Sequence, residues 1–248
     1  MLLADPTTSY LATVPVLVLA GGLGTRLRLA YEEGPKVMAP IDGRPFLAYV
    51  LRGLQVAGFR RIVLCVGYRH ESIRAWLGDG QRLGLDVKYS IEDEPLGTGG
   101  AILQGASRFS PSERFFVLNG DSLLQLDFKS MWERHKDSGP LATIALVFAG
   151  DTNRYGTVDV DNDDNVRGFH EKSCDHQEGY INGGVYLFEP EVLNLVSCER
   201  SVSLEREVLP VLVSQSFRAF KCRGYFIDIG VPEDFLRAQS ELRGYCHD

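Results

Sequence analysis

The sequence has no long apolar segment and no basic residue near its start. Its longest apolar run in that region, Val14 to Gly22, is far shorter than the roughly 20 residues that cross a bilayer. Residues 1–13 carry Asp5 but no lysine or arginine, so the basic region of a secretory signal peptide is missing. We therefore expect no membrane partner, a flexible leader over residues 1–13 and a single domain over residues 14–248.

Cysteine is too scarce and too scattered to form cross-links or a zinc ribbon. The five cysteines form no C-x-x-C pair, and their odd number argues against a disulfide framework. His170, Cys174 and His176 lie close together, but their spacing matches no standard zinc pattern. The cysteines favour a reducing, cytoplasmic setting, with Cys65 as a small residue of the core.

Positive charge is also in deficit. The chain has 26 lysines and arginines against 33 aspartates and glutamates, a net charge of −7. A sequence-independent grip on nucleic acid needs a basic surface, so we expect no nucleic-acid partner. A local cluster of cations and backbone N–H groups can still bind phosphates. The acidic run from Asp159 to Asp164 has no glycine at its sixth position, as a calcium loop would require, and predicts a hairpin turn.

The first half of the chain alternates apolar runs with amphipathic segments. The continuous apolar runs are typical of strands buried on both faces of a parallel sheet; they cover residues 16–20, 62–66, 87–91 and 115–118. Helices are expected between them, one opening at Pro45 and others at 71–77 and 101–108. This order predicts an α/β fold with a doubly wound, Rossmann-like, mostly parallel sheet.

The second half is richer in strands. Short strands are expected at 141–148, 157–160, 166–170 and 181–188, and a hairpin at 217–222 and 225–229. Helices are expected at 128–135, 191–196 and 204–213, and a last one begins at Pro232. We expect residues 14–125 to hold a nucleotide and the β-rich residues 126–248 to hold a second substrate.

A glycine-rich segment follows the first predicted strand. It runs from Leu19 to Arg26 as L-A-G-G-L-G-T-R, and Lys36 lies ten residues further on. The glycines let backbone N–H groups approach phosphate oxygens, and Arg26 and Lys36 add positive charge. A Walker A loop is excluded because no lysine follows Gly24, and the Rossmann pattern lacks its third glycine because Leu27 stands there. The segment predicts a phosphate-binding loop of another kind.

These residues resemble the opening L-A-G-G-x-G-T-R-L…P-K of the sugar-1-phosphate nucleotidyltransferase family. The resemblance runs from Val16 to Leu236, and further motifs match in order. They are E-P-L-G-T-G-G-A at 94–101, N-G-D at 119–121, F-H-E-K at 169–172, I-N-G-G-V-Y at 181–186, S-L-E at 203–205 and F-I-D-I-G at 226–230. The turn P-L-G-T-G-G-A-I is most similar to that of D-glycero-α-D-manno-heptose 1-phosphate guanylyltransferases.

The resemblance implies a fold of the nucleotide-diphospho-sugar transferase type and transfer of NMP from an NTP to a sugar 1-phosphate. Its implied catalytic residues are Arg26, Lys36, Asp121 and Lys172. Its implied nucleotide-binding residues are Leu19, Ala20, Gly21, Gly22, Gly24, Thr25, Arg26, Lys36, Glu92, Pro95, Gly97, Thr98 and Gly120. The implied sugar-phosphate residues are Gly156, Glu171, Lys172 and Asn182. Asp121 and Asp228 would bind Mg²⁺, with Mn²⁺ as an alternative, and a homodimer is possible.

The residue beside the base in this family predicts the nucleotide. Glu92 offers two acceptors, which suit the adjacent N1–H and N2–H₂ donors of guanine and oppose the carbonyls of uracil or thymine. Asp93 and Glu94 are alternative contacts. GTP is therefore the expected nucleotide. The resemblance implies a heptose 1-phosphate as the other substrate, with mannose 1-phosphate or another NTP and sugar pair as alternatives. A glycosyltransferase would carry a D-x-D pair, which N-G-D is not, and a non-catalytic sensor would be expected to lack Arg26, Lys36 or the aspartates.

Overall fold

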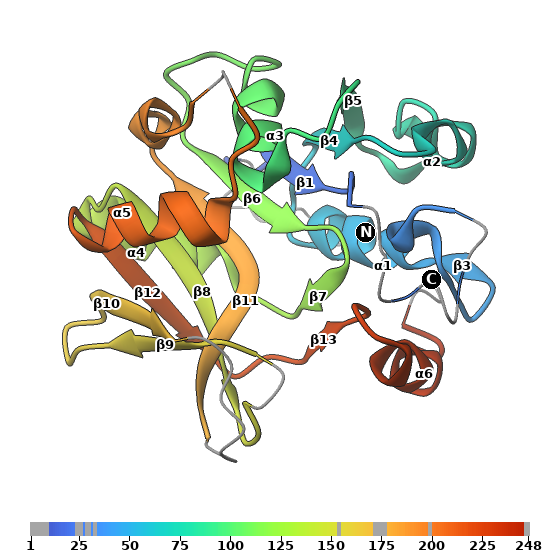
Figure 1. Cartoon of the computed structure of the whole chain (residues 1–248). Coiled ribbons are helices and arrows are strands. Elements are labelled where there is room, and N and C mark those ends of the chain that lie inside the picture. The colour runs from blue at the N-terminus through green and yellow to red at the C-terminus, as the bar shows by residue number, and fades with distance from the viewer. Residues whose placement is uncertain are drawn as a thin grey trace, which may run out of the picture.

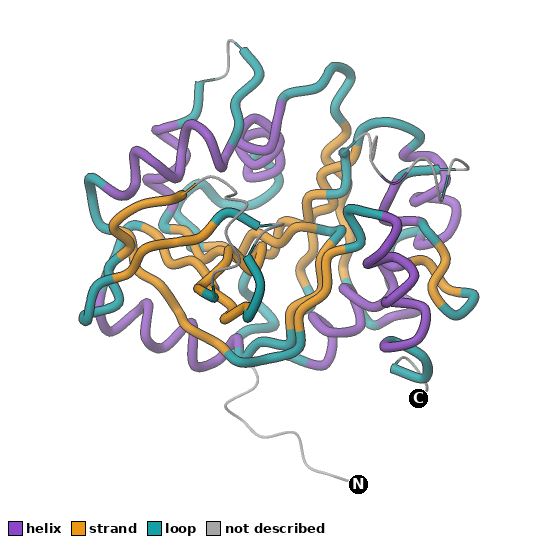
Figure 2. Tube along the Cα trace, turned by 60° about the horizontal axis from the view of Figure 1, so that its bottom comes forward, coloured by secondary structure: helices purple, strands orange, loops and turns teal. Residues whose placement is uncertain are grey.

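The computed structural model describes residues 10–22, 27, 31, 34–152, 155–170, 178–197 and 200–245. Within them, nine strands form one sheet, and shorter strands form two small pairs. In Figure 1 the elements of the first half lie on the right, and strands β8 to β12 lie on the left. Figure 2, turned by 60°, shows helices around the outside with strands running between them.

Four parallel strands form the nucleotide side of the sheet, as the apolar runs predict. They are β1 (Val16–Leu19), β4 (Arg61–Val66), β5 (Asp86–Ile91) and β6 (Phe115–Asn119), in the order β6-β1-β4-β5. Leu17 pairs with Val63 of β4 on one side and with Val117 of β6 on the other. The expected doubly wound, mostly parallel arrangement is confirmed for this half.

Alternate residues of these strands belong to two separate apolar clusters, one on each face of the sheet. Val16 and Val18 of β1 belong to one apolar cluster, whereas Leu17 between them belongs to another. This alternation follows from the two-residue repeat of a strand, and it shows that both faces of the sheet are covered. The first cluster receives apolar side chains from α1 (Phe46–Val56), α2 (His70–Leu77), α4 (Phe128–Ser138) and α6 (Pro232–Glu241). The second receives them from α3 (Gly97–Ala106) and α5 (Leu209–Val213).

The strand-rich second half continues the same sheet with mostly antiparallel pairs. Its strands are β8 (Ala142–Ala149), β9 (Thr157–Val160), β10 (Val166–His170), β11 (Gly179–Phe188) and β12 (Phe217–Cys222). β11 is the link, because it runs antiparallel to β6 on one side and to β8 on the other. The acidic turn between β9 and β10 is confirmed: the Asp161 carboxylate accepts bonds from Asp163 N and Asn165 N, each at 2.9 Å. These bonds hold a tight loop, and Arg167 Nε adds a bond to Asp161 Oδ2 at 2.9 Å.

The predicted hairpin of residues 217–222 and 225–229 is wrong. β12 instead runs parallel to β8, and β13 (Phe226–Asp228) pairs antiparallel with β7 (Ser122–Leu124), a short strand that the sequence pattern did not reveal. Gly224 lies between them against the Gln125 carbonyl, where an added Cβ would come within 1.8 Å of the oxygen. The chain therefore turns away from β12 at this glycine and crosses to the nucleotide side, as Figure 1 shows.

Helix α3 begins four residues before its expected start at Ala101. Glycine disfavours helix, so the G-T-G-G stretch predicted a turn, but tertiary bonds hold it in helical form. Gly99 N donates to the Val202 carbonyl at 2.8 Å, and Leu204 N donates to the Thr98 hydroxyl at 2.7 Å. The glycine-rich motif is therefore the first turn of a helix that docks onto residues from the second half of the chain.

The remaining elements are short. They are the 3₁₀ helices η3 (Lys36–Met38), η4 (Gln81–Leu83) and η5 (Pro190–Leu195), the π-helical turn η6 (Leu204–Val208), and the strand pair β2 (Pro40–Ile41) and β3 (Arg44–Pro45). The helix expected over 204–213 is thus a wide turn followed by α5. Of the expected leader, residues 10–13 pack on the body, with Leu11 only 3% exposed. No helix among the described residues is long and apolar enough to cross a membrane.

A buried polar network joins α4 to β8 and to the end of β11. The His135 side chain is fully buried; its Nδ1 lies 2.7 Å from the Thr143 hydroxyl and its Nε2 lies 3.1 Å from Glu189 Oε1. Arg114 Nε donates to the same Glu189 oxygen at 2.6 Å. Burial outweighs the neighbouring carboxylate and lowers the pKa of His135 from 6.5 to about 4. The imidazole is therefore neutral, with Nε2–H donating to Glu189 and Nδ1 accepting from Thr143.

This histidine predicts a loss of stability in acid. A base whose pKa is lower in the folded state stabilises the fold fully above its unfolded pKa, and that stability is lost as the pH falls toward the folded pKa. With the pKa of His135 at about 4, we expect a loss of about 2 kcal/mol between pH 8 and pH 5 from this residue. Urea unfolding of the wild type and His135→Gln at both pH values measures it.

The exposed His170 provides a matched control. His170→Gln should keep the wild-type difference between the two pH values, whereas His135→Gln should reduce it. If the unfolding free energy changed equally between the two pH values in all three proteins, His135 would not be the cause of the acid sensitivity.

Candidate active site

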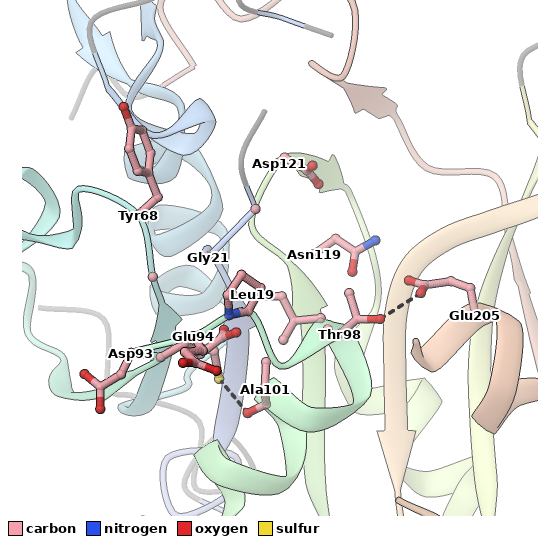
Figure 3. A pocket seen from close by; sticks show the side chains of 16 residues that line it. Leu19, Gly21, Tyr68, Asp93, Glu94, Thr98, Ala101, Asn119, Asp121 and Glu205 are labelled. Carbon is pink, nitrogen blue, oxygen red and sulfur yellow. Dashed lines mark hydrogen bonds between the residues drawn. The ribbon is translucent and has the colours of Figure 1, made fainter. Parts of the chain in front are cut away.

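A cavity of about 570 Å³ opens at the carboxyl ends of β1, β4, β5 and β6. Ligands of open α/β sheets bind at this edge, because the loops that follow the strands meet there. Figure 3 shows the cavity from close by. It is lined by Leu19, Gly21, Gly22, Cys65, Gly67, Tyr68, Glu92, Asp93, Glu94, Pro95, Gly97, Thr98, Ala101, Asn119, Asp121 and Glu205.

The start of the glycine-rich loop forms one wall. Ala20 N donates to the Cys65 carbonyl at 2.8 Å and so continues the β1–β4 pairing to the rim. A Cβ on Gly21 would lie 2.9 Å from Glu92 Oε1 and 3.3 Å from Gly67 N. A larger residue at position 21 would therefore displace the Glu92 side chain and crowd the turn that follows β4. Gly24, Thr25 and Arg26 lie outside the described residues.

Lys36 joins the two aspartates predicted to bind metal. Its Nζ lies 2.7 Å from Asp121 Oδ2 and 3.4 Å from Asp228 Oδ1, and the lysine side chain is only 12% exposed. Asp121 follows β6 and Asp228 ends β13, while Lys36 begins η3. Three segments that are distant in sequence thus bring one cation and two anions together, as the motif pattern requires.

Backbone pairing fixes the two aspartates. In the β7–β13 pair Asp228 is opposite Ser122, and Ile229 N donates to the Asp121 carbonyl at 3.0 Å. Gly120 N donates to the Leu19 carbonyl at 2.9 Å, and a Cβ on Gly120 would come within 2.7 Å of that oxygen. The close approach at Gly120 places Asp121 directly over the end of β1.

The aspartate pair fits a divalent cation. Burial, and then the negative charge of Asp121, raise the pKa of Asp228, whereas Lys36 opposes the rise. Added positive charge at this point would therefore be stabilised. Among the described residues no group of three or more His, Cys, Asp or Glu side chains could hold a metal. Two carboxylates that leave the other positions to phosphate oxygens and water suit Mg²⁺.

Glu92 lines another part of the cavity, at the turn that follows β5. Glu92 N donates to the Val66 carbonyl at 2.8 Å, and Glu92 Oε2 accepts a bond from Leu96 N at 3.0 Å. Burial raises the pKa of Glu92. The predicted base contact requires two free acceptor oxygens on Glu92, but one of them already accepts a backbone bond. Leu19 and Ala101 add apolar atoms to the lining, which a flat base would need, and Cys65 lies buried behind it.

The structure brings most of the predicted nucleotide residues to the cavity but not the described sugar residues. Asn182 uses its amide internally, because Nδ2 donates to the Tyr186 hydroxyl at 2.6 Å and Oδ1 accepts from Gly184 N at 2.9 Å. Neither Asn182 nor Gly156 lines the cavity. Glu171 and Lys172 lie outside the described residues. Their predicted contacts with a sugar phosphate stay predictions.

Several lining residues were not among the predicted site residues, and three of them carry polar side chains from other segments. Tyr68 follows the glycine after β4, Asn119 ends β6, and Glu205 comes from η6. Asn119 and Glu205 belong to motifs that the sequence analysis identified without giving either residue a role. Glu205 lies beside Thr98 in Figure 3, although it comes from the other half of the chain. Glu205 lies beside Thr98 because residues 202–204 form hydrogen bonds through their backbone with the start of α3, a contact that the sequence does not reveal.

Comparison with known proteins agrees with the geometry. The chain is 42% identical over 230 residues to the D-glycero-alpha-D-manno-heptose 1-phosphate guanylyltransferase of Aneurinibacillus thermoaerophilus. The aligned region covers 92% of this chain and 98% of that protein. It is 37% identical over 232 residues to the mannose-1-phosphate guanylyltransferase of Mycobacterium tuberculosis, covering 92% of this chain and 64% of that protein.

Solved structures give the same result for the fold. HddC from Yersinia pseudotuberculosis complexed with GMP-PN matches with a TM-score of 0.83 and 36% identity, over 92% of this chain and 99% of that one. A putative glucose-1-phosphate thymidylyltransferase from Bacillus anthracis, at 22% identity, shares the fold with a TM-score of 0.82. The family model described as nucleotidyl transferase matches residues 15–244. With a match across nearly its whole length, the chain belongs to the nucleotidyl transferase family.

Proposed function

We propose that the protein transfers GMP from GTP to a sugar 1-phosphate and releases pyrophosphate. The observation that carries the proposal is one cavity with two different ends. Glu92 and the apolar atoms of Leu19 and Ala101 in the lining suit a base. Asp121, also in the lining, joins the cavity to the Lys36–Asp121–Asp228 cluster, which suits phosphates. The guanylyltransferase relatives support guanine as the base.

The proposed acceptor is D-glycero-α-D-manno-heptose 1-phosphate. The support is the 42% identity to a protein of that name, which has nearly the same length. Mannose 1-phosphate is the second candidate, because the Mycobacterium tuberculosis relative is named for it. Both sugars have the D-manno ring, so a single site shape would serve either.

The proposed reaction is an in-line displacement at the α-phosphorus of GTP. The oxygen of the sugar phosphate attacks and pyrophosphate leaves, and no general base is needed because the attacking group is already an anion. The protein contributes alignment and charge neutralisation. Mg²⁺ or Mn²⁺ held by Asp121 and Asp228 would neutralise charge on the reacting phosphates. Lys36 would hold the phosphate oxygens from its place between the aspartates.

Two further cations complete the proposed site. Arg26 would hold the leaving pyrophosphate, and Lys172 would hold the sugar phosphate, with Glu171 on sugar hydroxyls. A cytoplasmic enzyme with no membrane or nucleic-acid partner fits such water-soluble substrates, and a homodimer stays a prediction.

Pyrophosphate release from purified enzyme tests the proposal. GTP, ATP, CTP, UTP and dTTP are each offered with heptose, mannose and glucose 1-phosphates. The expected result is release with GTP and a D-manno sugar 1-phosphate. A nucleotide-sugar glycosyltransferase or a non-catalytic sensor would release no pyrophosphate from any pair, and that outcome would reject the proposal.

Glu92 predicts the base preference. We expect Glu92→Gln to reduce the ratio of kcat/KM for GTP over UTP by about 10- to 100-fold, because a mismatched buried polar pair costs about 1–3 kcal/mol. The glutamine oxygen can still accept the bond from Leu96 N, so the turn keeps its shape. Steady-state kinetics with both nucleotides measure the ratio, and Asp93→Asn is the neighbouring control. A wild-type preference for UTP would refute the guanine assignment.

A further inference from the structure

Two residues of the Lys36–Asp121–Asp228 cluster lie on strand pairs outside the main sheet. Asp228 ends β13, which forms a sheet of two strands with β7. Lys36 begins η3, which leads directly into the two-stranded sheet of β2 and β3. Each strand of that second pair has only two residues. Isolated strand pairs are marginally stable in water, so both segments depend on contacts with other elements.

Helix α6 binds the segment that carries Lys36. Gln239 Nε2 donates to the Pro40 carbonyl at 2.6 Å, and Gln239 Oε1 accepts from Asp42 N at 3.3 Å. The turn of this strand pair, at Asp42 and Gly43, has φ values of 47° and 74°, a left-handed conformation that is typical of two-residue hairpins. One amide group therefore holds both the strand that follows η3 and the start of its turn.

The same helix binds the strand that ends at Asp228. The Tyr225 hydroxyl, just before β13, donates to Glu241 Oε2 at 2.7 Å. Arg237 Nη2 donates to the Phe226 carbonyl at 3.4 Å, and its Nε lies 3.1 Å from Glu241 Oε1. In Figure 1 α6 lies at the lower right, beside β13 and below β3. One helix thus supports both strand pairs, although they are far apart in the sequence.

The spacing of Lys36 and Asp228 depends on this helix. Asp121 has its own support, because Gly120 N bonds to β1 of the main sheet. Lys36 Nζ and the Asp228 carboxylate, which lie 3.4 Å apart, are instead placed by the two strand pairs that α6 joins. A displacement of about 1 Å at a reacting centre can lower a rate by about 10²-fold. The bonds of α6 are therefore placed to affect the reaction from a distance.

We propose that α6 positions Lys36 and Asp228 for the divalent cation, with Gln239 as the residue that joins the helix to the lysine segment. The inference rests on the proposed function, because the cation belongs to it. Gln239 lies outside the cavity lining and acts through Lys36, so it is a positioning residue. Without its two bonds the helix supports β13 less firmly, and the cation binds more weakly between the carboxylates.

Gln239→Met and Tyr225→Phe test the proposal from the two ends of the helix. Each exchange keeps the shape of the side chain and removes its hydrogen bonds. Both variants should have a lower kcat and a higher half-saturating Mg²⁺ concentration than the wild type. The change should be about tenfold in Gln239→Met, which loses two bonds, and smaller in Tyr225→Phe, which loses one.

Glu233→Gln is the matched control, because Glu233 is an exposed residue of the first turn of the same helix. It should change neither kcat nor the Mg²⁺ dependence. A helix that only stabilised the fold would give less active protein with an unchanged Mg²⁺ dependence, and thermal melting of each variant measures folding separately.

Chemical labelling of Lys36 gives a readout that needs no catalysis. The lysine side chain is only 12% exposed between its aspartates, so acetic anhydride should label it slowly in the wild type and in Glu233→Gln. Peptide mass spectrometry should find severalfold faster labelling of Lys36 in Gln239→Met. Labelling of the exposed Lys88 should be equal in all of these proteins.

An unchanged Mg²⁺ dependence in Gln239→Met and Tyr225→Phe would overturn the proposal, whether or not kcat fell. Labelling of Lys36 at the wild-type rate in Gln239→Met would overturn it as well. Absence of pyrophosphate release by the wild type would instead reject the proposed function, and the labelling of Lys36 would then decide by itself whether α6 holds this residue.

Discussion

Replacement of Asp121 by asparagine is expected to lower kcat/KM by at least 10²–10³-fold. The exchange keeps the shape of the side chain but removes the charge that pairs with Lys36 at 2.7 Å and that would hold a divalent cation. Loss of one charge-stabilising contact in the transition state costs on the order of 3–4 kcal/mol. Pyrophosphate release at saturating Mg²⁺ measures the loss.

Two controls separate this effect from a change in folding. Asp137 is exposed on α4, and Asp137→Asn should keep full activity. The wild type in excess EDTA should be inactive and should recover when Mg²⁺ or Mn²⁺ is restored. Full activity of Asp121→Asn, or of the wild type in EDTA, would contradict the proposed mechanism.

Lys36→Met should lower kcat by on the order of 10²-fold or more. The methionine fills similar space, but it leaves Asp121 and Asp228 facing each other without the ammonium that lies between them. Lys36→Arg keeps a charge in a different geometry and should be intermediate. Single-turnover kinetics with GTP and the sugar 1-phosphate measure the chemical step directly.

The exposed Lys88 on β5 offers the matched control. Lys88→Met should behave as the wild type in the same experiment. If Lys36→Met retained more than a tenth of the wild-type kcat, the lysine would hold the aspartates only and would take no part in the reaction.

The parallel strands were predictable from the sequence because strands buried on both faces consist almost entirely of apolar residues. β1, β4 and β6 are apolar at nearly every position, since both faces of each strand are covered. The same reasoning failed for β12 and β13. Their residues indicate strands, but strand propensity does not identify the neighbouring strand. The turn at Gly224 separates β12 from β13, so that β12 pairs with β8 and β13 pairs with β7.

The site was predictable where a motif determines the backbone. Gly120 allows close approach to Leu19, and Asp121 follows it, so the N-G-D pattern brings that carboxylate to the cavity. The bonds of the Asn182 side chain were not predictable in the same way, because its amide oxygen and nitrogen both bind other residues of β11. The place of Glu205 in the cavity could not be predicted from the sequence, because it depends on a contact with Thr98, which lies about a hundred residues away in the chain.

The β7–β13 pair also sets the order in which the molecule can be completed. Lys36 and Asp121 are 85 positions apart, whereas Lys36 and Asp228 are 192 apart. A chain still emerging from the ribosome can form β1, β4, β5 and β6 and bring Lys36 to Asp121 before β13 exists. The second aspartate arrives only when the last strand closes a long loop, which is the entropically expensive step. Any chain that ends before β13 therefore lacks Asp228, the second carboxylate beside Lys36.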